Sequence, residues 1–370
     1  MNPAQELYKY GTSVWYDNIS REILDNGELK RLISEWGVRG LTSNPTIFNL
    51  AFAKGNAYDA QIKSLASRGL STEQLFMELA VSDIGRAADL LLPIYNESGG
   101  NDGFVSIEVS PLLAADTKGS IEEGLRLFGQ LKRPNIMIKI PGTKEGIPAV
   151  RALLIEGVNV NITLLFSLEN YTVVAKTYCE ALEERVKRGL PIDRIRSVAS
   201  FFVSRVDTEI DKRLQKIIKD DNSRAKAATS YLGKFGVANC RVVYERFKEI
   251  FEGNNFKALK EKGAVAQRPL WASTGVKNPS YRDVLYVEEL IGPHTVNTMP
   301  HETLAAFVDH GKAVKETLHR DLAQAKSMAK ELVELGVDVD GVLADLQVQG
   351  VKKFEESFVE LNQTLKKKVA

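Results

Sequence analysis

Short runs of apolar, β-branched and aromatic residues alternate along this chain with longer stretches whose apolar residues recur at helical spacing. Eight of the short runs predict strands, at 12–17, 38–43, 104–109, 136–140, 158–163, 197–203, 269–274 and 295–299. Amphipathic stretches lie between them, for example at 73–95, 120–131, 144–156 and 168–188. Regular alternation of strands and helices favours a parallel sheet.

The number of strands favours a closed barrel over an open doubly wound sheet. An open sheet of the dinucleotide-binding kind would also need a glycine-rich turn of the form GxGxxG after a strand, and the chain has none. We therefore predict an α/β fold, a (β/α)8 TIM barrel with additional helices. Residues 1–370 are expected to form one domain, because such barrels routinely exceed 250 residues.

Two helical regions lie outside the eight-strand count. The first is an insertion at about 207–263, with helices expected at 224–235 and 241–251. The second runs from about 301 to 368 and ends in the solvated lysine run Lys366–Lys368. These regions are predicted either to cover the barrel or to form the contact of a homodimer.

One strand carries a charge where an apolar residue would be expected. Ile136, Ile138 and Ile140 share one face of their strand, so Met137 and Lys139 share the other. A parallel strand that is only structural reads apolar on both faces. Lys139 is therefore predicted to point into the barrel, late in its strand, where barrel active sites are built.

The neighbouring strands break the apolar pattern in the same phase. Glu108 shares a face with Ser106, and Asp17 follows Tyr16 at the end of the first strand. In the fifth strand the polar residues Asn159, Asn161 and Thr163 alternate with the apolar residues Val160, Ile162 and Leu164. Because the third, fourth and fifth strands are neighbours, we expect Glu108, Lys139 and Thr163 to lie close together.

Two interpretations of Lys139 stay open on the residues alone. A buried unpaired charge costs several kcal/mol, so the lysine could form a structural ion pair with Glu108 or Asp17. Alternatively, burial favours the uncharged amine, which can attack a ketone to form a Schiff base. A carboxylate and a hydroxyl nearby would then position water and transfer protons.

Cations follow two of the later strands. Arg205 comes after the sixth strand, and Lys277 comes shortly after Ser273 at the end of the seventh. The late loops of a barrel often hold a phosphate. Each cation could equally be a solvated surface charge.

Composition and charge narrow the function classes. The formal net charge is +1, so nucleic acid and membranes are not expected as partners. The two cysteines, Cys179 and Cys240, are too few to staple a chain of 370 residues, and no targeting or membrane-spanning segment is evident. We expect a cytoplasmic protein. The four histidines have no metal-ligand spacing and no nucleotide-binding motif occurs, so no metal or cofactor is expected.

Taken together, five motifs resemble the transaldolase family closely. They occur in the family's order and are GLTSNPT at 40–46, VSIEV at 105–109, IMIKIPGT at 136–143, NVNITLLFS at 159–167 and SFFVSR at 200–205. The resemblance spans most of the chain, from Asp17 to about Met299.

The resemblance implies specific roles. Lys139 would form the Schiff base, Glu108 and Thr163 would hold the catalytic water, and Asp17 would act as acid and base where the C–C bond breaks. The substrate-binding residues would be Asn44, Asn161, Ser200, Phe202, Arg205, Ser273 and Lys277. The implied reaction moves a dihydroxyacetone unit from sedoheptulose 7-phosphate to glyceraldehyde 3-phosphate in the pentose phosphate pathway, which gives erythrose 4-phosphate and fructose 6-phosphate.

Two positions favour transfer over simple aldol cleavage. The related fructose-6-phosphate aldolases resemble this pattern with tyrosine in place of Phe202 and glutamine in place of Glu108. The alternatives to a transaldolase are such a class I aldolase and a non-catalytic sugar-phosphate-binding barrel.

In two respects the chain departs from the common pattern. Many members carry an arginine shortly after the serine that ends the seventh strand, whereas here the nearest cation, Lys277, comes a few residues later. The insertion at about 207–263 is absent from shorter members and resembles that of the longer bacterial subgroup.

Overall fold

A closed barrel of eight parallel strands forms the centre of the computed structural model, which describes residues 2–369. The strands pair in chain order, and β1 pairs with β8 to close the barrel. The predicted (β/α)8 fold is therefore confirmed. The strands are β1 (Thr12–Tyr16), β2 (Gly40–Leu41), β3 (Val105–Glu108), β4 (Ile136–Pro141), β5 (Val160–Leu165), β6 (Ser197–Phe202), β7 (Arg268–Ala272) and β8 (Thr295–Met299).

The second strand is much shorter than the predicted 38–43. Only Gly40 and Leu41 have strand geometry, although the backbone N–H groups of Arg39 and Thr42 still donate to β1. Gly40 packs against the ring of Trp15, and a Cβ atom at this position would lie 2.4 Å from that ring. The glycine therefore allows the large indole to fill this part of the barrel interior.

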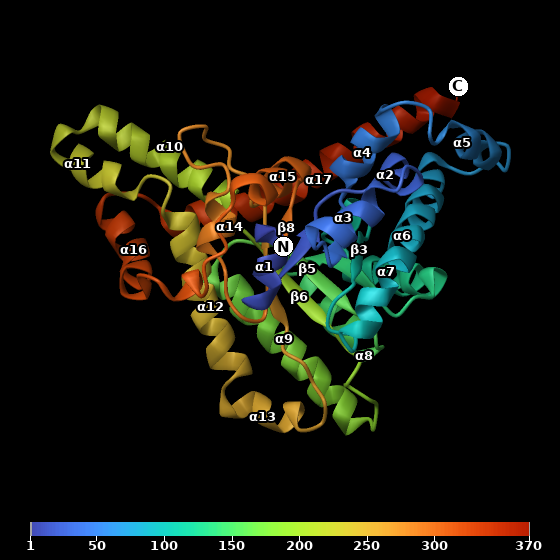
Figure 1. Ribbon diagram of the computed structural model, residues 1–370, viewed down its shortest axis with the longest axis horizontal. Helices are drawn as coiled ribbons and strands as arrows, with labels where there is room; N and C mark the ends of the chain where they lie inside the picture. Colours follow the sequence, from blue (N-terminus) through green and yellow to red (C-terminus); the bar gives the residue numbers. More distant parts are fainter. Residues whose placement is uncertain (1, 370) are drawn as a thin grey trace.

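Helices surround the barrel (Figure 1). The predicted stretches correspond, within a few residues at each end, to α6 (Thr72–Glu97), α7 (Thr117–Leu131), α8 (Gly146–Ile155) and α9 (Leu168–Lys187). Local capping explains two of the helix starts. Ser71 caps α6 in a capping box with Gln74, and Ser167 caps α9 with Asn170. None of the helices within residues 2–369 is both long enough and apolar enough to cross a membrane.

The region 207–263 lies within four consecutive helices, α10 (Ser204–Asp220), α11 (Asn222–Tyr231), α12 (Phe235–Phe251) and α13 (Asn254–Lys260), and the loop that follows them. The predicted helix at 224–235 was wrong at its end, because Gly233 has a positive φ of 67° and separates α11 from α12. Cys240 lies inside α12 and is buried.

Asp207 joins α10 to its neighbours. Its carboxylate accepts from the Gly236 N–H at 2.6 Å and from the Tyr286 hydroxyl at 2.8 Å. Burial raises the pKa of Asp207 to about 6. This buried carboxyl therefore holds the first inserted helix against the start of α12 and against α14 (Leu285–Glu289).

The C-terminal region contains α15 (His301–His310), α16 (Leu322–Glu334) and the long helix α17 (Val339–Val369). α17 contacts α10 and β5 and runs on to pack along α4 (Pro45–Ala53) and α5 (Asp59–Ala66) (Figure 1). Lys368, expected in a solvated run, instead donates to the Asp59 carboxylate at 2.7 Å. The last turn of α17 is thus fastened to α5.

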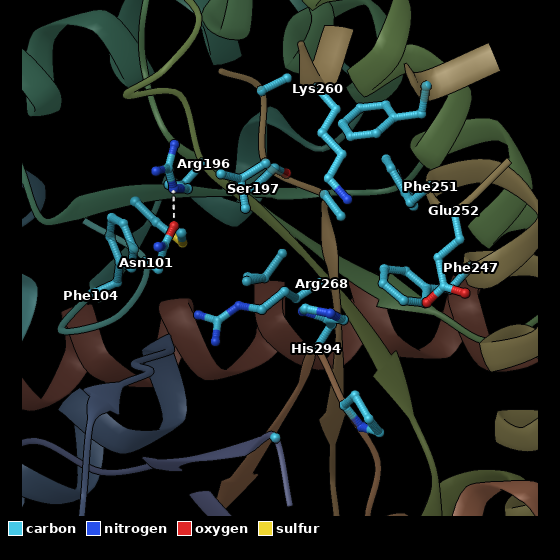
Figure 2. Close-up of a pocket in the computed structure, with 18 of the residues that line it drawn as sticks. Asn101, Phe104, Arg196, Ser197, Phe247, Phe251, Glu252, Lys260, Arg268 and His294 are labelled. Atoms are coloured by element: carbon cyan, nitrogen blue, oxygen red, sulfur yellow. Dashed lines mark hydrogen bonds between the residues drawn. The ribbon is translucent and has the colours of Figure 1, made fainter. Parts of the chain in front are cut away.

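A cavity of about 550 Å³ lies at the N-terminal end of the barrel. Arg196 and Arg268 from the strand starts face it, together with Phe247, Phe251 and Lys260 from α12 and α13 (Figure 2). None of the predicted site residues lines this cavity. Its size alone therefore does not mark the candidate active site, which lies at the opposite end of the strands.

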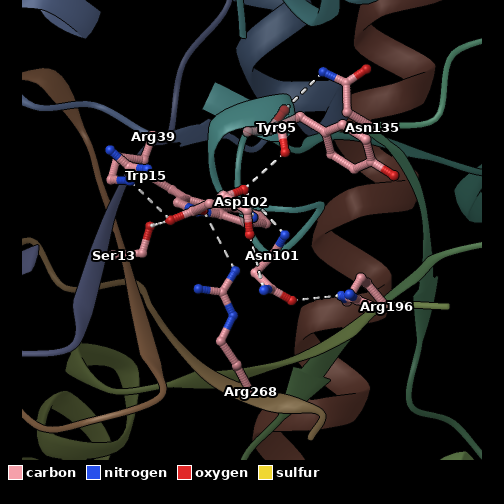
Figure 3. A network of polar contacts seen from close by, with 11 residues as sticks. Ser13, Trp15, Arg39, Tyr95, Asn101, Asp102, Asn135, Arg196 and Arg268 are labelled. Carbon is pink, nitrogen blue, oxygen red and sulfur yellow. Dashed lines mark hydrogen bonds and ion pairs between the residues drawn. The ribbon is translucent and has the colours of Figure 1, made fainter. Parts of the chain in front are cut away.

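The buried carboxylate of Asp102 connects several segments at the N-terminal end of the barrel (Figure 3). It accepts from the Ser13 hydroxyl at 2.6 Å, the Trp15 indole at 3.0 Å and the Arg39 guanidinium at 3.2 Å. Arg268 of β7 lies 3.5 Å from Oδ1, the oxygen that also accepts from Trp15. Because its charge is fully paired, Asp102 has a structural role that the strand pattern did not reveal.

Candidate active site

Lys139 lies between two polar neighbours in the barrel interior. In the strand register Glu108 of β3 is opposite Lys139 of β4, which is opposite Asn161 of β5. The lysine Nζ donates to Glu108 Oε2 at 3.1 Å and to the Ser43 carbonyl at 3.2 Å. Its side chain is only 7% exposed. The inward direction predicted from the three isoleucines is therefore confirmed.

Lys139 and Glu108 form a buried ion pair. The contact that the structural interpretation of Lys139 requires is therefore present. Burial raises the pKa of Glu108 above its ordinary value, and the nearby Lys139 opposes that increase. Replacing such a pair by apolar residues is often neutral for stability. Stability alone therefore does not explain why two charges occupy the centre of this barrel.

Asp17 is held at the end of β1 by a residue that the sequence pattern did not single out. Thr42 donates to Asp17 Oδ1 at 2.6 Å and contacts the Thr298 hydroxyl at 2.7 Å. Burial raises the pKa of Asp17, while Thr42, Lys139 and Arg205 oppose the increase. The carboxyl therefore stays protonated to a higher pH than an exposed aspartate, which suits a group that gives and takes protons.

The side chains of Asn161 and Ser200 are buried and form a hydrogen-bonded pair near Lys139. The Ser200 hydroxyl donates to Asn161 Oδ1 at 2.6 Å, and Asn161 Nδ2 donates to the Ser106 hydroxyl at 3.0 Å. Asn44 lies farther along the rim, where it caps α4 by accepting from the Ile47 N–H at 3.0 Å. Its oxygen is thus used by the fold, and its amide N–H groups are the part that a substrate could meet.

The predicted alternation in the fifth strand was wrong beyond Thr163. The register with β6 shifts between Ile162 and Leu165, and Leu164 has a positive φ of 60°. Because of this irregularity Leu164 packs with the side chains inside the barrel rather than with Val160 and Ile162. The bulge ends the regular pattern immediately after Thr163.

The Thr163 hydroxyl is buried and has no hydrogen-bond partner within residues 2–369. Buried hydroxyls are normally bonded, and such exceptions often mark functional positions. Thr163 faces Pro141 in the register, two pairs beyond the pair that Lys139 forms with Asn161. A water or a substrate hydroxyl is the partner that this position can accept.

We expect Thr163→Val to separate activity from stability. Loss of the hydroxyl should lower turnover about 10- to 100-fold if it orients a catalytic water. The free energy of unfolding should stay within about 1 kcal/mol of the unmodified protein or increase, because no protein hydrogen bond is lost. Chemical denaturation and initial rates measure the two quantities.

Thr12→Val is the matched control. Thr12 lies at the other end of the barrel, where its hydroxyl bonds to Thr295 at 2.9 Å and to the Gly292 carbonyl at 3.1 Å. This change should destabilise the fold and leave turnover unchanged. A Thr163→Val protein that unfolds more easily but turns over normally would contradict the proposed role.

Arg205, Ser273 and Lys277 line a second cavity of about 320 Å³ at the C-terminal ends of β6 and β7. Arg205 follows Ser204, the first residue of α10, and its guanidinium lies 5.1 Å above the ring of Phe202. Ser273 has a positive φ of 57°, and its hydroxyl contacts that of Ser204 at 2.9 Å. The cations predicted on separate loops are thus brought together.

The helix α17 supplies residues that sequence reasoning missed. Gln347 donates to the carbonyls of Gly142 and Leu164, both at 3.0 Å, which places α17 over the ends of β4 and β5. The Phe354 ring lies 5.3 Å from Lys139 Nζ. These residues follow ordinary helical spacing about 200 positions after Lys139, so no local signal distinguished them from core residues.

Within residues 2–369, no group of three or more His, Cys, Asp or Glu side chains could hold a metal ion. The polar groups at this site are instead the amine of Lys139, two carboxyls, hydroxyls and an amide. This set can form an imine with a ketone and then move protons around it.

Comparisons with known proteins agree with this geometry. The family model described as Transaldolase/Fructose-6-phosphate aldolase matches residues 14–365. A transaldolase of Mycolicibacterium smegmatis is 47% identical over 95% of this chain and 93% of its own length. Transaldolases of Thermobifida fusca and Saccharopolyspora erythraea are 48% and 46% identical, over 97% and 99% of this chain and 96% and 97% of their own lengths. With nearly its whole length matched, the chain belongs to the transaldolase/fructose-6-phosphate aldolase family.

Proposed function

We propose that this protein is a transaldolase that transfers a dihydroxyacetone unit between sugar phosphates through a Schiff base on Lys139. The observation that carries the proposal is the buried Lys139 amine paired with the Glu108 carboxyl, together with a cavity that is lined by several cations. Relatives that share 46–48% of its residues over nearly the whole chain carry the same name.

The reaction begins when the Lys139 amine adds to the C2 carbonyl of sedoheptulose 7-phosphate. Loss of water gives an iminium ion, and Glu108 and Thr163 hold the water that leaves and later returns. Asp17 then removes the proton from the C4 hydroxyl. The C3–C4 bond breaks, its electrons pass to the iminium nitrogen, and erythrose 4-phosphate leaves an enamine on Lys139.

The acceptor completes the cycle. The enamine carbon attacks the carbonyl of glyceraldehyde 3-phosphate, and Asp17 returns its proton to the new hydroxyl. Water then hydrolyses the imine and releases fructose 6-phosphate. Arg205, Ser273 and Lys277 hold the phosphate, while Asn44, Asn161, Ser200 and Phe202 surround the carbon chain. Phe354 covers Lys139 on the solvent side, which protects the enamine from premature protonation.

Dependence on the acceptor tests this function. With fructose 6-phosphate alone, release of glyceraldehyde 3-phosphate should stop after about one turnover per active site, because the enamine waits for an acceptor. Adding erythrose 4-phosphate should start steady turnover and produce sedoheptulose 7-phosphate, measured by mass spectrometry. Steady release of dihydroxyacetone without an acceptor would instead identify a class I aldolase. Binding of sugar phosphates without any turnover would indicate the non-catalytic barrel.

The proposal also includes a cytoplasmic location and a homodimeric assembly for this protein. Cys179 and Cys240 are both free thiols, which supports a reducing compartment such as the cytoplasm. A homodimer is supported by exposed apolar side chains on the packed pair α4 and α17, where Leu50 is 58% and Val359 is 49% exposed.

A further inference from the structure

Three cations converge on the 320 Å³ cavity, and one of them comes from the C-terminal helix. Arg205 lies at the start of α10, Lys277 follows β7, and Lys353 is on α17. None of the three has an ion-pair partner within residues 2–369. Like charges that share a cavity repel one another, so this arrangement favours an anion between them.

The acidic residue in the same cavity does not cancel this charge. Glu209 lines the wall, but its carboxylate is paired with Lys212 at 2.5 Å and with Arg213 at 3.1 Å on its own helix. The cavity therefore keeps an excess of positive charge.

Close packing of α17 on the barrel explains how Lys353 reaches this position. Gly350 lies against β5, and a Cβ atom there would be 2.8 Å from a methyl group of Leu164. Glycine inside a helix costs about 1 kcal/mol relative to alanine. Here it lets α17 lie directly on the strand ends, so that the next turn brings Lys353 to the cavity and Phe354 to Lys139.

We propose that Lys353 is a substrate-binding residue that contacts the phosphate of both the ketose and the aldose substrates from the helix covering the site. This inference rests on the proposed function. It assigns to α17 a part in specificity for phosphorylated sugars, in addition to covering Lys139. Lys277 is a point charge that cannot make a forked contact with a phosphate, so interactions remain that a second lysine can supply.

Lys353→Met tests the proposal, with Lys352→Met as the matched control. Lys352 is the adjacent residue of α17, is exposed, lies 3.9 Å from Glu356 and does not line the cavity. Because Lys353 is also exposed, neither change should disturb folding. Lys353→Met should raise KM for fructose 6-phosphate and erythrose 4-phosphate about five- to tenfold and leave kcat nearly unchanged.

Two further measurements separate phosphate binding from a general effect on the helix. The KM for the unphosphorylated acceptor erythrose should not change in Lys353→Met. Inhibition by inorganic phosphate should weaken in Lys353→Met, remain normal in Lys352→Met and recover in Lys353→Arg. Equal KM values and equal phosphate inhibition for the two methionine variants would overturn the inference. Transfer activity of the unmodified protein tests the proposed function separately, so the two failures are distinguishable.

Discussion

Replacing Lys139 by methionine is expected to lower transfer activity about 10⁴-fold or more, because no other amine replaces the one that forms the Schiff base. Treatment with fructose 6-phosphate and borohydride should add one reduced three-carbon unit to the unmodified protein, at Lys139, and none to the variant. Peptide mass spectrometry reads both results. Lys277→Met should still give the adduct, since that lysine lies in the phosphate cavity.

The same variant should fold, with a changed response to pH. Methionine fills the space of the lysine but leaves Glu108 buried without its cation. Burial already raises the pKa of Glu108, and loss of Lys139 removes the main opposing influence. A carboxyl with a raised pKa in the fold binds protons more strongly than in the unfolded chain. The contribution of this carboxyl to the free energy of unfolding is therefore fully present below the ordinary glutamate pKa and is lost as pH rises through the raised pKa.

Urea denaturation at several pH values measures this loss. The variant Lys139→Met should lose stability with rising pH more steeply than the unmodified protein. Adding Glu108→Gln should remove the difference, because glutamine does not titrate. Retained transfer activity in Lys139→Met, or an adduct on another lysine, would show that Lys139 is only one half of a structural ion pair.

Asp17→Asn is expected to block C–C cleavage while leaving Schiff-base formation intact. Asparagine keeps an oxygen that can accept from Thr42 but cannot take the C4 hydroxyl proton. Turnover should decrease about 10²- to 10⁴-fold. Borohydride should still attach the intact hexose phosphate to Lys139, so the adduct carries six carbons rather than three.

The pH profile gives a second measure of Asp17. Cleavage requires its ionised form, so kcat of the unmodified protein should increase with pH through the raised pKa of this carboxyl. That limb should be absent from the residual activity of Asp17→Asn. A variant that forms no adduct at all would place Asp17 in imine formation rather than in cleavage.

Much of the architecture could be predicted from the sequence because successive residues of a barrel strand face opposite sides, so the residue types alternate. The alternation of isoleucines around Lys139 was enough to predict that its side chain points inward. The order of the strands was enough to predict that Glu108 lies beside it. Phase reasoning was wrong for Leu164, since a bulge adds an irregularity that the alternation of residue types does not reveal.

The parts of the site that were missed come from contacts between distant segments. Thr42 orients Asp17 from the loop that follows β2, and the α17 residues Gln347, Lys353 and Phe354 reach the strand ends from the far end of the chain. Their residue types are ordinary for a loop and for an amphipathic helix, so no local pattern separates them from structural positions.

The sequence by itself determined the family, the eight-stranded barrel and the lysine around which the proposed chemistry is arranged. These follow from periodicity and from motifs that persist along the chain. Only the tertiary structure decided that Lys139 pairs with Glu108, that the Thr163 hydroxyl has no protein partner, and that α17 closes over the site. Pairing and covering depend on distances between segments far apart in the chain, and such distances are set by packing rather than by local residue preference.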